Sequence, residues 1–408
     1  MPKGIYECIN CGHREVRDSS EVLIENACPE CGGDLLLVGF EVKPVEEAKP
    51  VDERLEGLLQ SFYTLGEMKQ AGEVTAFEVL DVHEPNFERV LEALEPLGYW
   101  AALKKREGKV VLYVFSAQES KESNPYVGIA LFILTLLSTI MAGYYLSLGY
   151  ISFLNEYSLP GVRNIWINAL AFSISVLAIL GTHEMGHKIA ATLHGVKSTF
   201  PYFIPFPNIL GTLGAVIRVK SPIPTRNAAI DLGVSGPIAG FIVAVPVLII
   251  GLRLSVALPA SAVKPVEGGI IFGNSLIMTL IETYILKIPE DYVINLHPVA
   301  IAGWVGILVT FLNLIPAAQL DGGHVARAFL GEKAHTYATM GVGFLLILMS
   351  YFWVGWALWG FIVLLMGRVG NPGALDEVSP ISGRRIVLAL AVLLIFLLSA
   401  TPAPLSTT

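Results

Sequence analysis

Long apolar runs in the second part of the chain place the strongest constraint on its fold. From residue 125 onward, several stretches reach about twenty residues, the length that a helix needs to cross a bilayer. The candidate spans are residues 125–147, 164–191, 228–252, 297–316, 335–351, 353–367 and 386–402, with 269–286 as a weaker candidate. We therefore predict a polytopic α-helical membrane protein with about six to eight spans.

The composition divides the chain at the same place. Charged residues make up only 15% of the 408 residues, against roughly 25% in soluble globular domains, and residues up to about 123 are charged in the ordinary way. The formal net charge is −8 and no basic stripe stands out, so we expect no nucleic-acid partner. The opening residues, MPKGIYECINCGH, lack the apolar core of a signal peptide, so we expect the N-terminus not to be exported.

All cysteines of the chain lie near its start, as two Cys-x-x-Cys pairs. They are Cys8, Cys11, Cys28 and Cys31, and sixteen residues separate the two pairs. Four thiolates at this spacing are typical of a zinc ribbon, in which the metal is structural and has no open coordination position. We predict such a ribbon over residues 1–40. The alternative is unligated thiols or redox pairs.

The rest of the polar part reads as a small α/β domain between two linkers. Residues 41–53 form a Pro/Glu-rich linker, 54–116 the domain, and 117–124 a short polar linker. Within the domain we expect helices near 53–63 and 85–98, a strand at 75–80, and a hairpin of 99–104 with 109–115. No catalytic group of residues stands out there, and the partner of this N-terminal region is unknown.

Lys and Arg in the short loops predict the orientation. Between the second and third spans the chain carries Lys188, Lys197, Arg218, Lys220 and Arg226, whereas the segment after the first span has only Arg163. Positive loops remain on the cytoplasmic side of a membrane. We therefore expect an integral protein of the cell membrane whose N-terminal domain is cytoplasmic.

The strongest chemical motif is GTHEMGHKIAA, at the end of the second apolar span. His183 and His187 are four residues apart, so on a helix both imidazoles face one metal ion, and Glu184 between them can act as general base. A chance match is the alternative. Ionisable side chains in an apolar helix cost free energy, which favours a functional site.

A catalytic zinc needs a third protein ligand and one open position. Asp321, in FLNLIPAAQLDGGH, is the best candidate, because its span would return it to the depth of the two histidines. Gly322 and Gly323 after it would let the backbone turn tightly. The alternative for Asp321 is a residue in the turn at a helix C-terminus.

Together these motifs resemble those of the site-2 protease family of intramembrane metalloproteases. The resemblance rests on HEMGH at 183–187 and on NLIP at 313–316 followed by LDGG at 320–323, and it extends over about 125–402. GPIAG at 236–240 and GTLGAVIRV at 211–219 also match. It implies an intramembrane metalloprotease domain over residues 125–408, with a catalytic Zn²⁺ and Asp321 as third zinc ligand. It also implies that Asn313 holds the substrate backbone or the tetrahedral oxygen.

Three further features bear on the comparison with the family. Many members insert a peptide-binding domain of the PDZ type, and the loop from 255 to 295 is too short for one. The stretch 211–219 alternates at strand period and is expected to form a hairpin whose edge pairs with an extended substrate. The alternative is a re-entrant loop that only packs under the core. His324, three residues after Asp321, is a candidate for supporting the metal ligands.

The sequence therefore predicts hydrolysis of a peptide bond in or near a transmembrane helix of a membrane-spanning protein substrate. Two rival functions use the same residues. One is a membrane metal transporter that binds zinc through them, and the other is a catalytically inactive scaffold whose zinc ribbon recruits partners. The presence of Glu184 argues against both, because neither function requires a base beside the metal.

Overall fold

The computed structural model describes residues 3–8, 11, 14–18, 30–31, 35–40, 53–71, 74–117, 124–264 and 269–407. Near the start, β1 (Lys3–Cys8) pairs with β2 (Arg14–Asp18) and β3 (Leu35–Phe40) in an antiparallel sheet. Cys11 and Cys31 are exposed. The side chains of Cys8 and Cys28 lie outside the described residues, so the zinc ribbon stays a prediction.

The α/β region forms where the sequence predicts it. Its elements are α1 (Glu53–Phe62), β4 (Tyr63–Ala71), β5 (Val74–Val82), α2 (Phe87–Leu94), β6 (Tyr99–Arg106) and β7 (Lys109–Ser116). The Asn86 side chain caps α2, and Gly98 ends the turn after it with a φ of 76°. Strand β4 is the one element of this region that the sequence analysis did not predict.

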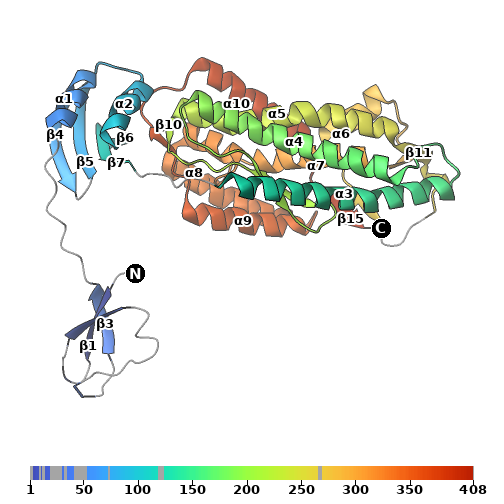
Figure 1. Ribbon diagram of the computed structural model, residues 1–408, viewed down its shortest axis with the longest axis horizontal. Coiled ribbons are helices and arrows are strands. Elements are labelled where there is room, and N and C mark those ends of the chain that lie inside the picture. The colour runs from blue at the N-terminus through green and yellow to red at the C-terminus, as the bar shows by residue number, and fades with distance from the viewer. Residues whose placement is uncertain are drawn as a thin grey trace.

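Two short strands from the second part of the chain extend this sheet. They are β10 (Ile223–Thr225) and β14 (Ala374–Asp376), and the strand order is β10-β14-β6-β7-β5-β4. Strand β14 runs parallel to β6, and the amide of Glu377 donates to the carbonyl of Leu103 at 3.0 Å. The α/β region and the helical part therefore share one sheet, at one end of the helices (Figure 1).

Helices make up most of the remaining chain, and several lie side by side along the long axis of the molecule (Figure 1). They are α3 (Pro125–Glu156), α4 (Ile165–Leu193), α5 (Arg226–Leu254), α6 (Leu276–Leu280), α7 (Pro298–Asn313), α8 (Asp321–Met349), α9 (Gly355–Val369) and α10 (Gly383–Ser399). Within the described residues, α3, α4 and α5 are long and apolar enough to cross a membrane. The predicted total of six to eight spans is not established by these three helices.

Two of the predicted spans differ from the helices. The span expected at 335–351 is the second half of α8, which begins at Asp321 and contains a non-helical residue, Gly331, with a φ of 77°. The weaker candidate 269–286 holds the five-residue α6 and a π-helical turn, Ile281–Ile285. Apolar composition alone does not distinguish a spanning helix from these arrangements.

Small residues let the central helices pack closely. A side chain at Gly251 of α5 would overlap the backbone of Ala300 in α7, and one at Gly303 would overlap Leu248. Helices α3 and α4 are joined by a 2.7 Å hydrogen bond between the hydroxyls of Thr139 and Ser173. Close approach through small residues is typical of helix packing in membranes, and here it fixes α4, α5 and α7 relative to one another.

The described residues form five sheets, and one of them lies near the predicted motifs. Strand β8 (Tyr202–Pro205) pairs antiparallel with β9 (Thr212–Val216). The stretch 211–219 therefore supplies only one strand of a hairpin, β9, which ends at Val216, and the other strand, β8, precedes the predicted bounds. Beyond β9 an isolated bridge joins Ser198 to Val219.

Candidate metal centre

Helix α4 carries the two predicted histidine ligands. Asn164 caps its first turn, and the chain then remains helical through Leu193. His183 and His187 lie four residues apart on the face that packs inward, with 3% and 9% of their surfaces exposed. Glu184 between them is 8% exposed. Three buried ionisable side chains on an apolar helix indicate a functional site.

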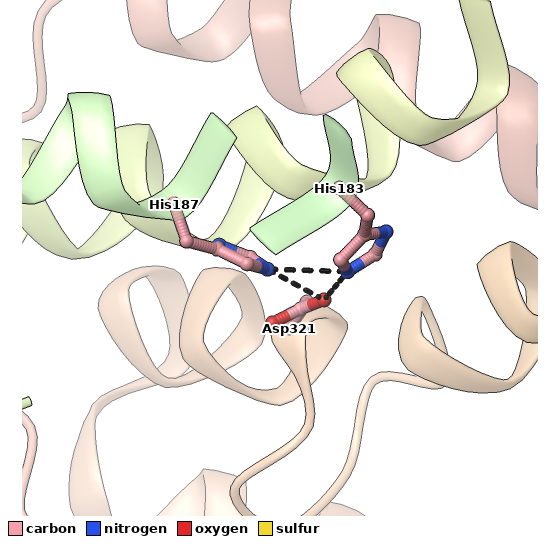
Figure 2. Close-up of side chains that lie close together, drawn as sticks. All are labelled: His183, His187 and Asp321. Atoms are coloured by element: carbon pink, nitrogen blue, oxygen red, sulfur yellow. Dashed lines mark hydrogen bonds and ion pairs between the residues drawn. The ribbon is translucent and has the colours of Figure 1, made fainter. Parts of the chain in front are cut away.

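The donor atoms of three predicted ligands converge. His183 Nε2 lies 3.2 Å from His187 Nε2, and Asp321 Oδ2 lies 3.3 Å from each of them. Figure 2 shows the two rings projecting from α4 toward the carboxylate at the start of α8. Among the described residues this is the group of histidine, cysteine and carboxylate side chains that could hold a metal ion.

The triangle of donor atoms fits zinc. Two ligands of a tetrahedral Zn²⁺, bound at about 2.0–2.1 Å, lie about 3.3 Å apart. The three measured separations of 3.2–3.3 Å agree with that value. Two imidazoles and one carboxylate are also a usual donor set for a catalytic zinc, which leaves a fourth position open.

Asp321 reaches the histidines because of a tight turn between α7 and α8. Ala318 adopts a φ of 53° in this turn, and Asp321 begins α8, where the helix dipole favours a negative charge. The predicted turn role of Gly322 and Gly323 is wrong, because both are helical. They are required for close packing instead: a side chain at either would overlap the carbonyl of Leu314 or Ala317.

Helix α5 supports the imidazoles from the other side. The carbonyl of Leu232 lies 2.8 Å from His187 Nδ1, so this nitrogen donates and Nε2 keeps its lone pair for a metal. A side chain at Gly236 would overlap the His187 ring, and one at Gly240 would press on His183. The GPIAG sequence at 236–240 therefore leaves room for both histidines.

Glu184 is separate from the three donors. Its Oε2 accepts a 2.9 Å hydrogen bond from the amide of Ile217, one residue beyond β9. This bond joins the carboxylate of α4 to the hairpin. It orients Glu184 toward the cavity that the donors also line, as a general base requires.

The predicted polar residue Asn313 also lies at the site. It ends α7, and its Nδ2 is 3.2 Å from His183 Nε2. His324 lines the same cavity and contacts Asn371 at 3.4 Å. Both are thus placed beside the metal-ligand candidates, on α7 and α8.

The cavity has a volume of about 980 Å³ and extends well beyond the metal donors. Its lining includes the chain from Ala215 to Ile223 and the segment around β14. It also includes Ala102, Lys104, Arg106, Tyr113 and Phe115 of the α/β region. No functional residue of this region was predicted from the sequence. The alternation of Ala102, Lys104 and Arg106 on one strand face was the signal available.

A second polar cluster joins the α/β region to the helices. His194, which caps the end of α4, contacts Glu88 of α2 at 2.9 Å and Asp231 of α5 at 2.9 Å. Arg385 of α10 pairs with the same Asp231 at 2.6 Å. The hydrogen bonds to Asp231 and Glu88 raise the pKa of His194 above its ordinary value, against the opposing effect of its burial.

Comparison with known proteins finds matches over the segment of the chain that carries the candidate metal ligands. Residues 171–350 match the model of peptidase family M50. The chain is 33% identical over 242 residues to the probable zinc metalloprotease EGY1, chloroplastic, of Arabidopsis thaliana, in an alignment that covers 56% of this chain and 42% of that protein. It is 30% identical over 238 residues to the probable zinc metalloprotease EGY2, chloroplastic, of the same plant, with 56% and 41% covered.

The chain thus matches less than half the length of these relatives. Among solved structures, the site-2 protease from Methanocaldococcus jannaschii is similar at 18% identity and a TM-score of 0.26, covering 63% of this chain and 86% of that chain. So low a TM-score does not by itself establish a common fold. The family match nevertheless confirms the predicted resemblance. The matched segment contains all three converging side chains, so this part of the chain is similar to peptidase family M50.

Proposed function

We propose that this chain is an intramembrane zinc metalloprotease that hydrolyses peptide bonds in or near transmembrane helices of membrane-protein substrates. The observation that carries the proposal is the triangle of donor atoms with 3.2–3.3 Å sides, beside a glutamate that is not one of the donors. The match to family M50 supports it, as do the names of the relatives, which are probable zinc metalloproteases.

His183, His187 and Asp321 would hold the zinc. When bound there, Zn²⁺ supplies Lewis-acid chemistry, since it lowers the pKa of water and polarises the scissile carbonyl. Glu184 accepts a proton from the attacking water and passes it to the leaving amine. The Ile217 amide holds Oε2 of this carboxylate, which leaves Oε1 for the proton transfer.

Asn313 is proposed to stabilise the substrate. Its Nδ2 lies at hydrogen-bond distance from the donor triangle, 3.2 Å from His183 Nε2. From there the amide can donate to the carbonyl oxygen on which negative charge develops during attack. A fixed donor at such a position typically contributes about 10²–10³ in rate.

The hairpin is proposed to bind the substrate backbone as an added strand. A peptide bond inside a helix is not accessible to a nucleophile, so the substrate must unwind near the scissile bond. Pairing with an edge beside Glu184 would satisfy the freed amides and carbonyls. The hydrogen bond between Ile217 and Glu184 would then place the paired peptide next to the base.

We also propose an orientation in the membrane and a second zinc site. The α/β region lies at the end of the helices where the segment 195–227 begins, and Lys197 of this segment pairs with Glu95 at 2.8 Å. By the charge of that segment, this end faces the cytoplasm. Cys8, Cys11, Cys28 and Cys31 would hold a second, structural zinc.

The test is cleavage of a reporter with one transmembrane helix by the purified full chain in detergent. We expect Glu184→Gln to lower kcat by about 10²–10⁴-fold while the zinc content is unchanged, because the variant keeps the shape and the ligands but removes the base. Glu282→Gln is the matched control, since this glutamate is partly buried near α6 and bonds Asn274. It should cleave like the wild type.

Two outcomes would sink the proposal. Full activity of the Glu184 variant would exclude this residue as the base, and activity that survives a zinc chelator would exclude a metalloprotease. If wild-type protein binds zinc and cleaves no reporter, metal flux in proteoliposomes distinguishes the rivals. Flux would support a transporter, and no flux would support a scaffold.

A further inference from the structure

The open face of the α/β sheet supports an inference that goes beyond the proposed chemistry. This inference rests on the proposed function for the identity of the substrate. We propose that this face is an exosite that binds an acidic, extended segment of the substrate next to its membrane span. The occupant is thus a peptide segment rich in Asp or Glu. Four features of the sheet support this site: how it is held, how its faces differ, what charges it presents, and which cavity it lines.

The sheet is fixed relative to the metal centre. Strand β14, which precedes α10, pairs with β6, and β10, which leads directly into α5, pairs with β14. Leu375 of β14 packs against the core of the α/β region. Side-chain contacts between Lys197 and Glu95 and between His194 and Glu88 join the same two parts. A ligand on this sheet is therefore held at a defined distance from the zinc donors.

The two faces of the sheet have different environments. On β6 and β7, the side chains of Ala101, Leu103, Leu112 and Val114 are buried in the core with α1 and α2. The alternate residues point the other way, since side chains alternate along a strand. They are the cavity-lining Ala102, Lys104, Arg106, Tyr113 and Phe115. The face of the sheet opposite α1 and α2 is therefore one wall of the cavity that contains the metal donors.

The charge on this wall is positive. The carboxylates that line the cavity are Glu184 and Asp321, both at the metal centre, whereas the outer part presents Lys104 and Arg106. Lys104 Nζ is 3.9 Å from Glu377, but Arg327 holds that carboxylate more closely, at 2.6 Å. No carboxylate of the residues that the structure describes pairs with Arg106, which is exposed.

An acidic residue on the same face, Glu78, does not reverse this charge. Glu78 of β5 is paired with Lys109 at 2.8 Å and does not line the cavity. Beside the two cations, Tyr113 and Phe115 are half-buried and add an apolar surface. Cations next to aromatic rings suit a peptide that carries both carboxylates and apolar side chains.

The shape of the cavity favours an extended segment. Its lining runs from the metal donors along the chain at 215–223, past β14, to β6 and β7. A peptide whose scissile bond lies at Glu184 would leave the helices along this path and reach Arg106 beyond it. Figure 1 shows the α/β region at the end of the helices, where the flanking segment of a substrate span would emerge.

The test compares reporters that differ only in the segment flanking the span. Three versions carry four Glu, four Gln or four Lys in that segment, and KM and kcat are measured with the full chain in detergent. We expect the Glu reporter to have the lowest KM. Arg106→Glu should raise the KM for the Glu reporter about fivefold or more with little change in kcat, and should favour the Lys reporter instead. High salt should reduce the preference.

Lys105→Glu is the matched control. Lys105 is exposed and neighbours Arg106 on the same strand, but it lies on the opposite face. It should leave the order of the three reporters unchanged. Lys104→Gln provides a second variant that adds no negative charge beside Glu377, and it should weaken the preference for the Glu reporter.

A binding measurement separates this proposal from the protease function. Fluorescence anisotropy with the Glu184→Gln protein reports reporter binding without turnover. If the Glu reporter binds more tightly than the Gln reporter, and Arg106→Glu abolishes this difference, the exosite is supported even if no reporter is cleaved. Equal KM and equal binding for the Glu and Gln reporters, or equal effects of Arg106→Glu and Lys105→Glu, would overturn the exosite while cleavage itself remained established.

Discussion

His187 owes its position to atoms that lie outside the metal centre. The Leu232 carbonyl accepts a hydrogen bond from its Nδ1, and Gly236 on the next turn of α5 leaves the space that the ring occupies. Groups that orient a ligand in this way commonly change metal affinity by about 10- to 100-fold when they are altered. The metal centre is thus built by α5 as well as by the three donor residues.

The first prediction follows from that space. Gly236→Ala should displace the His187 ring, because the added methyl group would overlap it, and should lower zinc affinity by about tenfold or more. Zinc per chain, measured by elemental analysis after dialysis against a weak chelator, checks this. Gly341→Ala is the control, since a side chain there meets no atom within 4 Å. Equal zinc retention by both variants would show that α5 does not position the ring.

Single residues also show what the sequence could predict. The histidine pair was predictable because its spacing is a local property of one helix. The role of Gly322 and Gly323 was not, because it depends on the carbonyls of Leu314 and Ala317, which the turn at Ala318 brings close. A glycine in a sequence does not reveal whether it provides a turn or room for a neighbour.

At the scale of elements, long periodic segments were predicted and short ones were not. Helices α4 and α5 agree with the predicted spans 164–191 and 228–252 within a few residues. Strands β10 and β14 are three residues long, so neither shows a period. Strand β10 pairs with β14 and β14 pairs with β6, and each partner lies more than a hundred residues away. Their pairing is decided by tertiary packing, which local sequence does not contain.

Helices α2, α4, α5 and α10 meet at His194, and the second prediction belongs to this junction. The groups facing it are Glu88, Asp231 and, through Asp231, Arg385. These contacts raise the pKa of His194. The protonated imidazole therefore stabilises the junction fully below about pH 6.5, the ordinary pKa of histidine. This stabilisation is lost as the pH rises through the raised value, when the imidazole loses its charge.

We therefore expect the attachment of the α/β region to weaken with rising pH. Hydrogen exchange of β6 and β14 in the full chain, compared at pH values below and above this range after correction for the intrinsic rate, measures the effect. His194→Gln should remove the pH dependence. The same pH dependence in this variant would mean that another group controls the attachment.

On the scale of the whole molecule, the α/β region lies at one end of the helices, and β11 (Val256–Pro259) with its partner β13 (Tyr292–Asn295) lies at the other (Figure 1). Lys197 belongs to the first end, and Glu290, exposed just before β13, to the second. If α4 and α5 cross a membrane, these ends face its opposite sides. The Lys and Arg of the first end favour the cytoplasmic side for it.

The third prediction tests this orientation. An impermeant thiol reagent should label Glu290→Cys in intact cells and Lys197→Cys only after lysis, with peptide mapping to separate the new cysteine from the native ones. Because both positions are exposed, reactivity after lysis should be similar and serves as the internal control. Labelling of Lys197→Cys alone in intact cells would reverse the topology.

The shared sheet also determines which recombinations this protein can tolerate. A domain joined by a linker can be exchanged for another during evolution or in the laboratory without altering its neighbour. Here two of six strands are encoded beyond residue 220, on either side of α5 and α9. A chimera that replaces residues 54–116 alone would leave β14 without β6, so the α/β region and the helical part must be inherited as one unit.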